Sequence, residues 1–192
     1  MWWARLLNVI SGLLSGGAAA GGGTSYESIA TVTVGSGGSS SISFSSIPST
    51  FKHLQVRGIM RDTRATNPDS LLLTFNSDSS TNYSYHYLNG DGSIVDANAG
   101  TSANYIFLSR FAGANQTANA FGAIVIDVLE YANTNIYKTT RSIGGYDANG
   151  VGAIKLDSGN WRSTSAITSL TLTPANTSFV QYSSFALYGI KG

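Results

Sequence analysis

The sequence has no cysteine and few charged side chains. The absence of cysteine excludes disulfide bonds, thiolate metal sites and cysteine nucleophiles. Charged residues make up 11% of the 192 residues, well below the roughly one quarter that is usual for globular domains. The net charge is +1, so the composition provides no electrostatic surface for nucleic acid or anionic lipid. We therefore expect neither nucleic acid nor a membrane as a partner.

Groups suited to catalysis are also scarce. His53 and His86 are the two histidines, and no Gly-x-Ser-x-Gly motif accompanies them. Asp127 and Glu130 are the best local pair of carboxylates, but strand periodicity places them on opposite faces. We expect a protein without catalytic residues, although a cell-wall-active enzyme that uses Asp127 stays a third, weaker alternative.

Oxygen-rich loops are the best candidates for a metal site. They contain Asp91, Asp96 and Asn98 in one segment, and Asp147 and Asn149 in another. Such loops can bind calcium, but these two lack the acidic run and terminal glutamate of a calcium loop, and their sequences are typical of ordinary turns. No phosphate-binding loop or dinucleotide motif is present. We expect neither a metal nor a cofactor.

Apolar residues at helical spacing mark the first 17 residues. They recur at steps of three and four, which puts them on one face of a helix: Trp2, Trp3, Leu6, Leu7, Ile10, Leu13 and Leu14. Gly16 and Gly17 end this segment, and an Ala/Gly run completes it at residue 23. We predict that residues 1–23 are a docking helix with its tether, separate from a domain at 24–192.

Several roles are compatible with this amphipathic segment. It breaks after Leu14, whereas a membrane span needs about 20 apolar residues. Arg5, the apolar run and the small residues 18–20 match the layout of a secretory signal. Arg5 is the only charge on the polar face, which disfavours a membrane surface. Docking into a partner protein is the reading we prefer, and folding back on the same chain, a membrane surface and an uncleaved signal stay open.

The remainder of the chain reads as short β-strands separated by turn residues. The candidate strands are 29–34, 41–45, 53–60, 71–75, 83–88, 105–108, 123–129, 135–143, 153–156, 167–173 and 179–190. Residues 89–92 form a tight turn, and 144–150 a loop. Regular short strands with glycine-rich turns predict an all-β fold, an antiparallel β-sandwich or jelly roll.

One of these strands, 123–129, is apolar on both faces except at Asp127. This pattern predicts a central strand that is buried on two sides. A buried carboxylate needs a partner, so we expect Asp127 to pair with Arg57 or Arg141 or to lie at an interface.

Aromatic residues with polar tips are the strongest candidates for contact with a ligand or partner. Tyr83, Tyr85 and Tyr87 share one face of a strand, and Tyr146 and Trp161 are expected in loops. Such side chains suit both protein interfaces and stacking on sugars. A subunit interface is favoured over a glycan platform.

Four segments carry a resemblance to a known family. They are 26–34, 43–50, 53–57 and 185–190, and together they resemble a family of small tailed-phage virion proteins. The resemblance covers most of residues 24–192. It implies a β-sandwich that associates with itself on the virion surface, as capsid decoration, head fibre or tail appendage, with no catalytic residues to assign.

These observations lead to one hypothesis and one alternative. The hypothesis is a non-enzymatic virion structural protein: residues 1–17 dock into another virion protein of the capsid or tail, and the sandwich is displayed as a trimer or another cyclic oligomer. The alternative is a module that binds host-receptor glycan through Tyr146 and Trp161.

Overall fold

The structure, a computed structural model, describes residues 25–66 and 68–192. The predicted docking helix and its tether lie outside the described residues, and so do all the docking side chains: Trp2, Trp3, Leu6, Leu7, Ile10, Leu13 and Leu14.

The described residues form twelve strands and no helix. The strands are β1 (Tyr26–Thr33), β2 (Ile42–Phe44), β3 (His53–Met60), β4 (Asp69–Phe75), β5 (Tyr83–Gly90), β6 (Val95–Ala103), β7 (Ile106–Phe111), β8 (Gly122–Leu129), β9 (Lys138–Asp147), β10 (Gly152–Trp161), β11 (Leu170–Pro174) and β12 (Ser184–Ile190).

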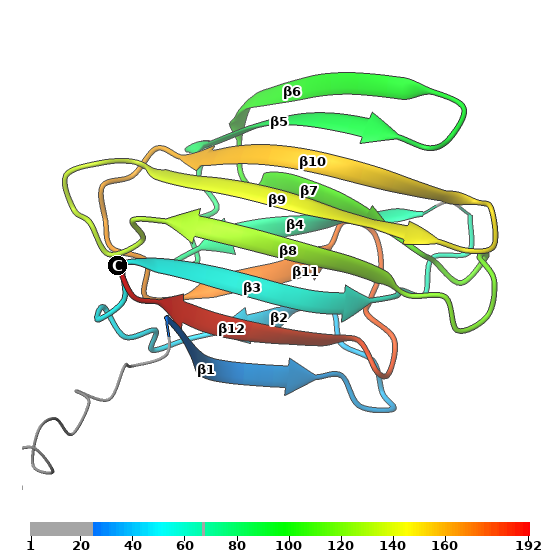
Figure 1. The fold of residues 1–192 in the computed structure, drawn as a ribbon, viewed down its shortest axis with the longest axis horizontal. Helices are drawn as coiled ribbons and strands as arrows, with labels where there is room; N and C mark the ends of the chain where they lie inside the picture. The colour runs from blue at the N-terminus through cyan, green and yellow to red at the C-terminus, as the bar shows by residue number, and fades with distance from the viewer. Residues whose placement is uncertain (1–24, 67) are drawn as a thin grey trace, which may run out of the picture.

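The strands form two antiparallel sheets stacked in layers. The large sheet has the order β1-β12-β3-β8-β9-β10-β5-β6, and the small sheet has the order β2-β11-β4-β7. Figure 1 shows the large sheet in front, with β6 and β1 at its opposite edges, and the small sheet behind it. The prediction of an all-β, antiparallel fold is therefore confirmed.

Eight of the strands pair as a nested set. β1 pairs with β12, β2 with β11, β3 with β8, and β4 with β7. A long hairpin rolled into two sheets in this way has the topology of a jelly roll. The other four strands form two hairpins, β5–β6 and β9–β10, which extend the large sheet beyond β8 (Figure 1).

The hydrophobic core lies between the two layers. Leu54 and Val56 of β3 face it from the large sheet, and Leu71 and Leu73 of β4 face it from the small sheet, all four fully buried. Their spacing of two residues follows from the alternation of side chains along a strand. Each such side chain contributes about 1.5–3 kcal/mol when it is buried, so this core stabilises the roll.

Several strand boundaries differ from the sequence-based prediction. β6 was not predicted, because Val95–Ala103 is rich in Asp, Asn, Ala and Gly, which are poor strand formers. β9 continues to Asp147, through residues predicted as a loop, and β10 reaches Trp161. The predicted strand 179–190 is divided: Phe179 forms isolated bridges, and β12 begins at Ser184.

The prediction that β8 is buried on both faces is wrong. Ile124, Ile126 and Val128 point into the core and are buried, but Ala123 is exposed and Val125 is half-buried on the other face. The apolar side chains of this outer face are left accessible because no described strand or loop forms a third layer over it. The outer face of the large sheet therefore carries accessible apolar side chains.

Candidate interaction face

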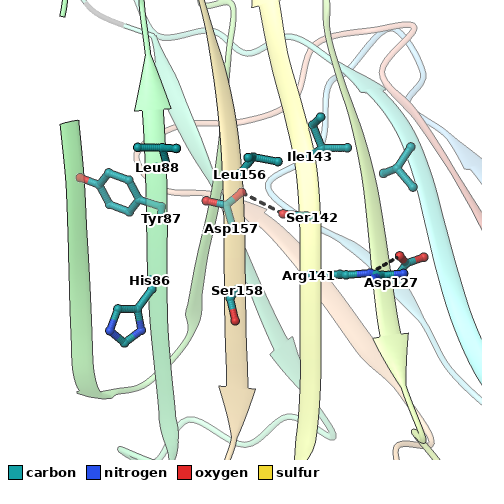
Figure 2. A pocket seen from close by; sticks show the side chains of 11 residues that line it. His86, Tyr87, Leu88, Asp127, Arg141, Ser142, Ile143, Leu156, Asp157 and Ser158 are labelled. Atoms are coloured by element: carbon teal, nitrogen blue, oxygen red, sulfur yellow. Dashed lines mark hydrogen bonds and ion pairs between the residues drawn. The ribbon is translucent and has the colours of Figure 1, made fainter. Parts of the chain in front are cut away.

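Five apolar side chains line up across five strands on the outer face of the large sheet. They belong to directly paired residues, which we call the first apolar row: Val125, Ile143, Leu156, Leu88 and Ala97. Ile143, Leu156 and Leu88 are 48%, 50% and 48% exposed. Figure 2 shows these three side by side on neighbouring strands. Directly opposed residues of a sheet are in contact range, so the row forms one continuous surface.

A second apolar row runs parallel to the first, two residues further along each strand. Its members are Ile59, Ala123, Gly145, Ile154, Gly90 and Val95. Ile59, Ile154 and Val95 are among the exposed large hydrophobic side chains of the chain. The two rows together make an apolar band that reaches β6 at the edge of the sheet.

A polar row borders the band on its other side. It contains Gln55, Asp127, Arg141, Ser158 and His86, again at directly paired positions. Gln55 Nε2 donates to Asp127 Oδ1 at 2.8 Å, and Arg141 Nε donates to Asp127 Oδ2 at 2.9 Å. Of the partners predicted for Asp127, Arg141 is confirmed.

Among the described residues, the two larger of three hollows in this face lie over the apolar rows. The first, about 460 Å³, lies over the first apolar row and reaches the polar row at Asp127 and Arg141 (Figure 2). The second, about 500 Å³, lies over the second row beside Gly145. Phe121 and Tyr146 also line it.

The inner side of β10 carries charged residues where apolar ones are usual. Lys155 and Asp157 are 2% and 5% exposed, and Lys155 Nζ lies 2.8 Å from Asp157 Oδ1. Lys155 Nζ also donates to the Leu108 carbonyl at 3.0 Å and lies 4.0 Å from the ring centre of Tyr87. Ser142 Oγ donates to Asp157 Oδ2 at 2.8 Å. Strand alternation then forces Ile154 and Leu156 outward.

Burial shapes the ionisation of this inner pair. It lowers the pKa of Lys155 and raises the pKa of Asp157, while their mutual attraction opposes both changes. A buried ion pair of this kind contributes little net stability, but loss of one partner leaves an uncompensated charge. The pair thus holds β10 with its apolar side facing solvent.

Two of the aromatic residues predicted as contact sites are core residues instead. Tyr83 and Trp161 are 0% and 2% exposed. Trp161 ends β10 rather than lying in a loop, and its Nε1 donates to Asp78 Oδ2 at 2.7 Å. Burial raises the pKa of Tyr83 to about 12. Neither ring is accessible to a sugar or to a partner, because both pack against Phe75 in the core.

The other aromatic residues predicted as contact sites are partly exposed to solvent. Tyr85 and Tyr87 are half-buried on the inner side of β5 and pack against Phe107, with ring centres 5.6 and 6.1 Å apart. Tyr146 is half-buried beside the second hollow. Of the two residues expected to contact glycan, Tyr146 alone retains accessible surface.

The residues considered for catalysis do not converge. His53 Nδ1 accepts the Glu130 N–H at 3.0 Å, and Glu130 pairs with Lys52 at 2.6 Å. Asp127 belongs to the separate pair with Arg141, and His86 is exposed on the polar row. His53 and Glu130 therefore make local structural contacts, whereas Asp127 and His86 both line the first hollow, three strands apart on the polar row.

The oxygens considered for calcium cap turns instead. Asp91 Oδ1 accepts the N–H groups of Ser93 and Ile94, and Asp147 Oδ1 accepts those of Asn149 and Gly150. Across residues 25–66 and 68–192, no three His, Cys, Asp or Glu side chains gather in a metal-binding arrangement.

The apolar band was missed at the level of sequence. Ile143, Ile154 and Leu156 lie in predicted strands, where apolar residues are normally assigned to the core. The available signal was the alternation of Ile154-Lys155-Leu156-Asp157, which shows two faces but does not say which face is inside.

Comparisons with known proteins find distant likeness only. No protein-family model and no curated protein matches the chain. Galectin LEC-6 of Caenorhabditis elegans has 8% identity and a TM-score of 0.32, covering 84% of this chain and 96% of the galectin. The CBM40 of the Ruminococcus gnavus IT-sialidase, solved with α2,3-sialyllactose, has 9% identity and a TM-score of 0.30, covering 84% and 91%. Likeness at this level says nothing about what this chain binds.

The described part of the chain contains no helix with the length and apolar character needed to cross a membrane.

Proposed function

We propose that the protein is a non-enzymatic structural component of a bacteriophage virion. Residues 1–17 attach it to another virion protein, and the jelly roll is displayed on the particle surface as capsid decoration or as part of the tail. The observation that supports this proposal is the apolar band on the outer face of the large sheet, which has the properties of a surface for protein contact.

The composition of the band favours a protein partner over a sugar. Leu88, Ile143, Ile154 and Leu156 are aliphatic and between 48% and 59% exposed. Contiguous exposed apolar patches on soluble domains mark interaction surfaces, and their burial yields about 25 cal/mol per Å². Sugar sites use exposed aromatic rings with polar groups, whereas the first apolar row contains neither.

Attachment through residues 1–17 follows from their chemistry. Seven apolar side chains, two of them tryptophans, lie at helical spacing, and the Ala/Gly run joins them to the domain. Burial in a partner supplies the binding energy, less the cost of ordering the segment. In a cyclic oligomer, several such segments bind together, so avidity increases the attachment.

A matched pair of full-length variants tests the attachment. Leu7→Asp places a charge on the apolar side of the segment, and Asn8→Asp places the same charge on its polar side. In virions grown with each variant supplied in trans, we expect loss of Leu7→Asp from particles and normal copy number for Asn8→Asp. Incorporation of Leu7→Asp at the normal copy number would refute the proposed attachment.

Host-receptor glycan binding is the second candidate, supported by one observation. Tyr146 and Asp147, an aromatic and an acidic residue, are both among the residues that line the second hollow. On a glycan array, sugar binding by the full chain that is lost in Tyr146→Ala and kept in Tyr137→Ala would favour this candidate. Tyr137 is a suitable control because it is 53% exposed and does not line either hollow.

A further inference from the structure

The two sheets have four edge strands, and three of them are protected against pairing with another chain. β1 carries Glu27 and a register shift between Ser28 and Ala30. β2 has only 3 residues, and β7 pairs with β4 through a register shift. Short strands, charges and bulges are the usual devices that prevent edge-to-edge association.

The fourth edge, β6, lacks these devices over most of its length. It has 9 residues, its pairing with β5 is regular from Val95 to Gly100, and its one register shift lies beyond Gly100, next to Ala103. It contains no proline and no basic residue. The side chain of Asp96, its only charge, accepts a hydrogen bond from Asn89 Nδ2 at 2.7 Å within the same hairpin. β6 therefore offers an open, regular strand edge.

The backbone groups at this edge can be assigned from the hairpin. The Asp91 N–H donates to the Ile94 carbonyl at 3.1 Å, which makes these two residues a hydrogen-bonded pair. Hydrogen-bonded and non-bonded pairs alternate along an antiparallel ladder. Val95, Ala97 and Ala99 are therefore in non-bonded pairs with β5, and their N–H and C=O groups point toward the open edge, where no described strand pairs with them.

We propose that β6 pairs with β6 of a second copy of this chain, antiparallel, about a two-fold axis at Ala97. In this register Ala97 lies opposite Ala97 of the second copy, and Val95 lies opposite Ala99. Ala97 then exchanges both backbone hydrogen bonds with Ala97 of the second copy, and the Val95 N–H donates to the Ala99 carbonyl of the second copy. The Ala99 N–H stays bonded to the Asn98 side chain. A contact of this kind is self-complementary and closes as a dimer.

The side chains of β6 fit this register. Asp96 lies opposite Asn98 of the second copy, so the two Asp96 carboxylates are not opposed. The Asn98 side-chain oxygen accepts the Ala99 N–H at 2.7 Å, and its amide group is left to donate to the carboxylate. The register therefore avoids opposing like charges and allows a hydrogen bond between Asn98 and Asp96.

The pairing also extends the apolar band. The first apolar row ends at Leu88 and Ala97, on the same face of the sheet as the edge. With Ala97 at the two-fold axis, the row of one copy meets the row of the other and forms a single surface across ten strands. Pairing with a second copy therefore explains both why the strand edge is open and why the first apolar row runs up to that edge.

A single cysteine at the axis tests the proposal, because the chain contains no other cysteine. Ala97→Cys in the full chain places two thiols on residues with Cα atoms about 5.5 Å apart, which is within the range of a disulfide. Ser158→Cys is the control, since Ser158 is also exposed on the outer face but lies on β10. Under mild oxidation, we expect a covalent dimer for Ala97→Cys and at least tenfold less for Ser158→Cys.

Sedimentation of charged variants provides the second measurement. Ala97→Lys brings two ammonium groups together at the axis without disturbing the core, and Ser158→Lys adds the same charge away from it. We expect the wild type and Ser158→Lys to be dimers at about 100 micromolar, the range of weak specific interfaces, and Ala97→Lys to be a monomer. A monomeric wild type, an Ala97→Lys dimer, or equal cross-linking of both cysteine variants would overturn the proposal.

Discussion

Asp62 is a fully buried carboxyl group next to a second one. Its Oδ2 accepts the Thr177 hydroxyl at 2.8 Å, and its Oδ1 accepts the Arg64 N–H at 3.2 Å. Burial raises its pKa to about 6, and its contact with the Asp69 carboxyl adds to this shift. Between the ordinary pKa of 3.8 and about 6, the folded chain keeps a proton that the unfolded chain has lost. The free energy of unfolding therefore falls as pH rises through this window.

Asp62→Asn should remove this loss, because an amide cannot ionise. We expect the variant to exceed the wild type in stability at pH 7.5 by about 1–3 kcal/mol, and the difference to shrink toward zero near pH 4. Urea denaturation from pH 4 to 8 measures it. A variant less stable than the wild type at pH 7.5 would contradict the assignment.

The pKa of Asp78 is shifted in the opposite direction to that of Asp62, so its effect on the pH dependence of stability is opposite too. Hydrogen bonds from Ser80 and Trp161 hold the pKa of its carboxyl well below the usual value. Its stabilising effect is therefore present at neutral pH and is lost as pH falls. In the same titration, Asp78→Asn should be less stable than the wild type at pH 7.5, which checks that the sign found for Asp62 is specific to its site.

At the scale of single elements, the β5–β6 hairpin offers a test within one turn. Gly92 has a φ of +89°, whereas Gly90 has no positive φ, and an added Cβ at either residue meets nothing within 4 Å. Only backbone conformation separates the two positions. Gly92→Ala should destabilise the domain by about 1 kcal/mol, and Gly90→Ala should change its stability by less than about 0.5 kcal/mol. Equal effects in thermal unfolding would contradict the left-handed conformation at Gly92.

The strands also show where sequence patterns reach their limit. The Leu71, Leu73 and Phe75 face of β4 was predicted and is fully buried, because apolar alternation there matches the core. In β10 the same rule fails. Lys155 and Asp157 are inside because each neutralises the other. This pairing along one strand depends on contacts with Leu108 and Ser142, which are distant in sequence.

At the scale of the whole molecule, the fold depends on its last strand. β12 lies between β1 and β3, and its Phe185 and Leu187 are fully buried. Deletion of residues 184–192 should abolish cooperative unfolding, because it opens the core and unpairs two strands. Deletion of 191–192 is the matched control and should retain the transition in circular dichroism. A cooperative transition in the longer deletion would contradict this dependence.

The fold class followed from the sequence more completely than the candidate site did. Strand spacing and turn residues predicted the sandwich, since these signals are local. The apolar band could not be predicted, because it arises from the register of six strands and from hairpins inserted at two places in the chain. The prediction that Tyr83 and Trp161 contact a partner or a glycan was wrong for the same reason, because Phe75 of the other sheet covers both rings.

The two added hairpins, β5–β6 and β9–β10, lie outside the eight nested strands of the jelly roll. The nested pairs β1–β12, β2–β11, β3–β8 and β4–β7 close the roll without them. Most of the apolar band and the open edge lie on β5, β6, β9 and β10. The accessible apolar surface and the open strand edge thus belong mainly to the two hairpins, whose inner sides still contribute Tyr83 and Trp161 to the core.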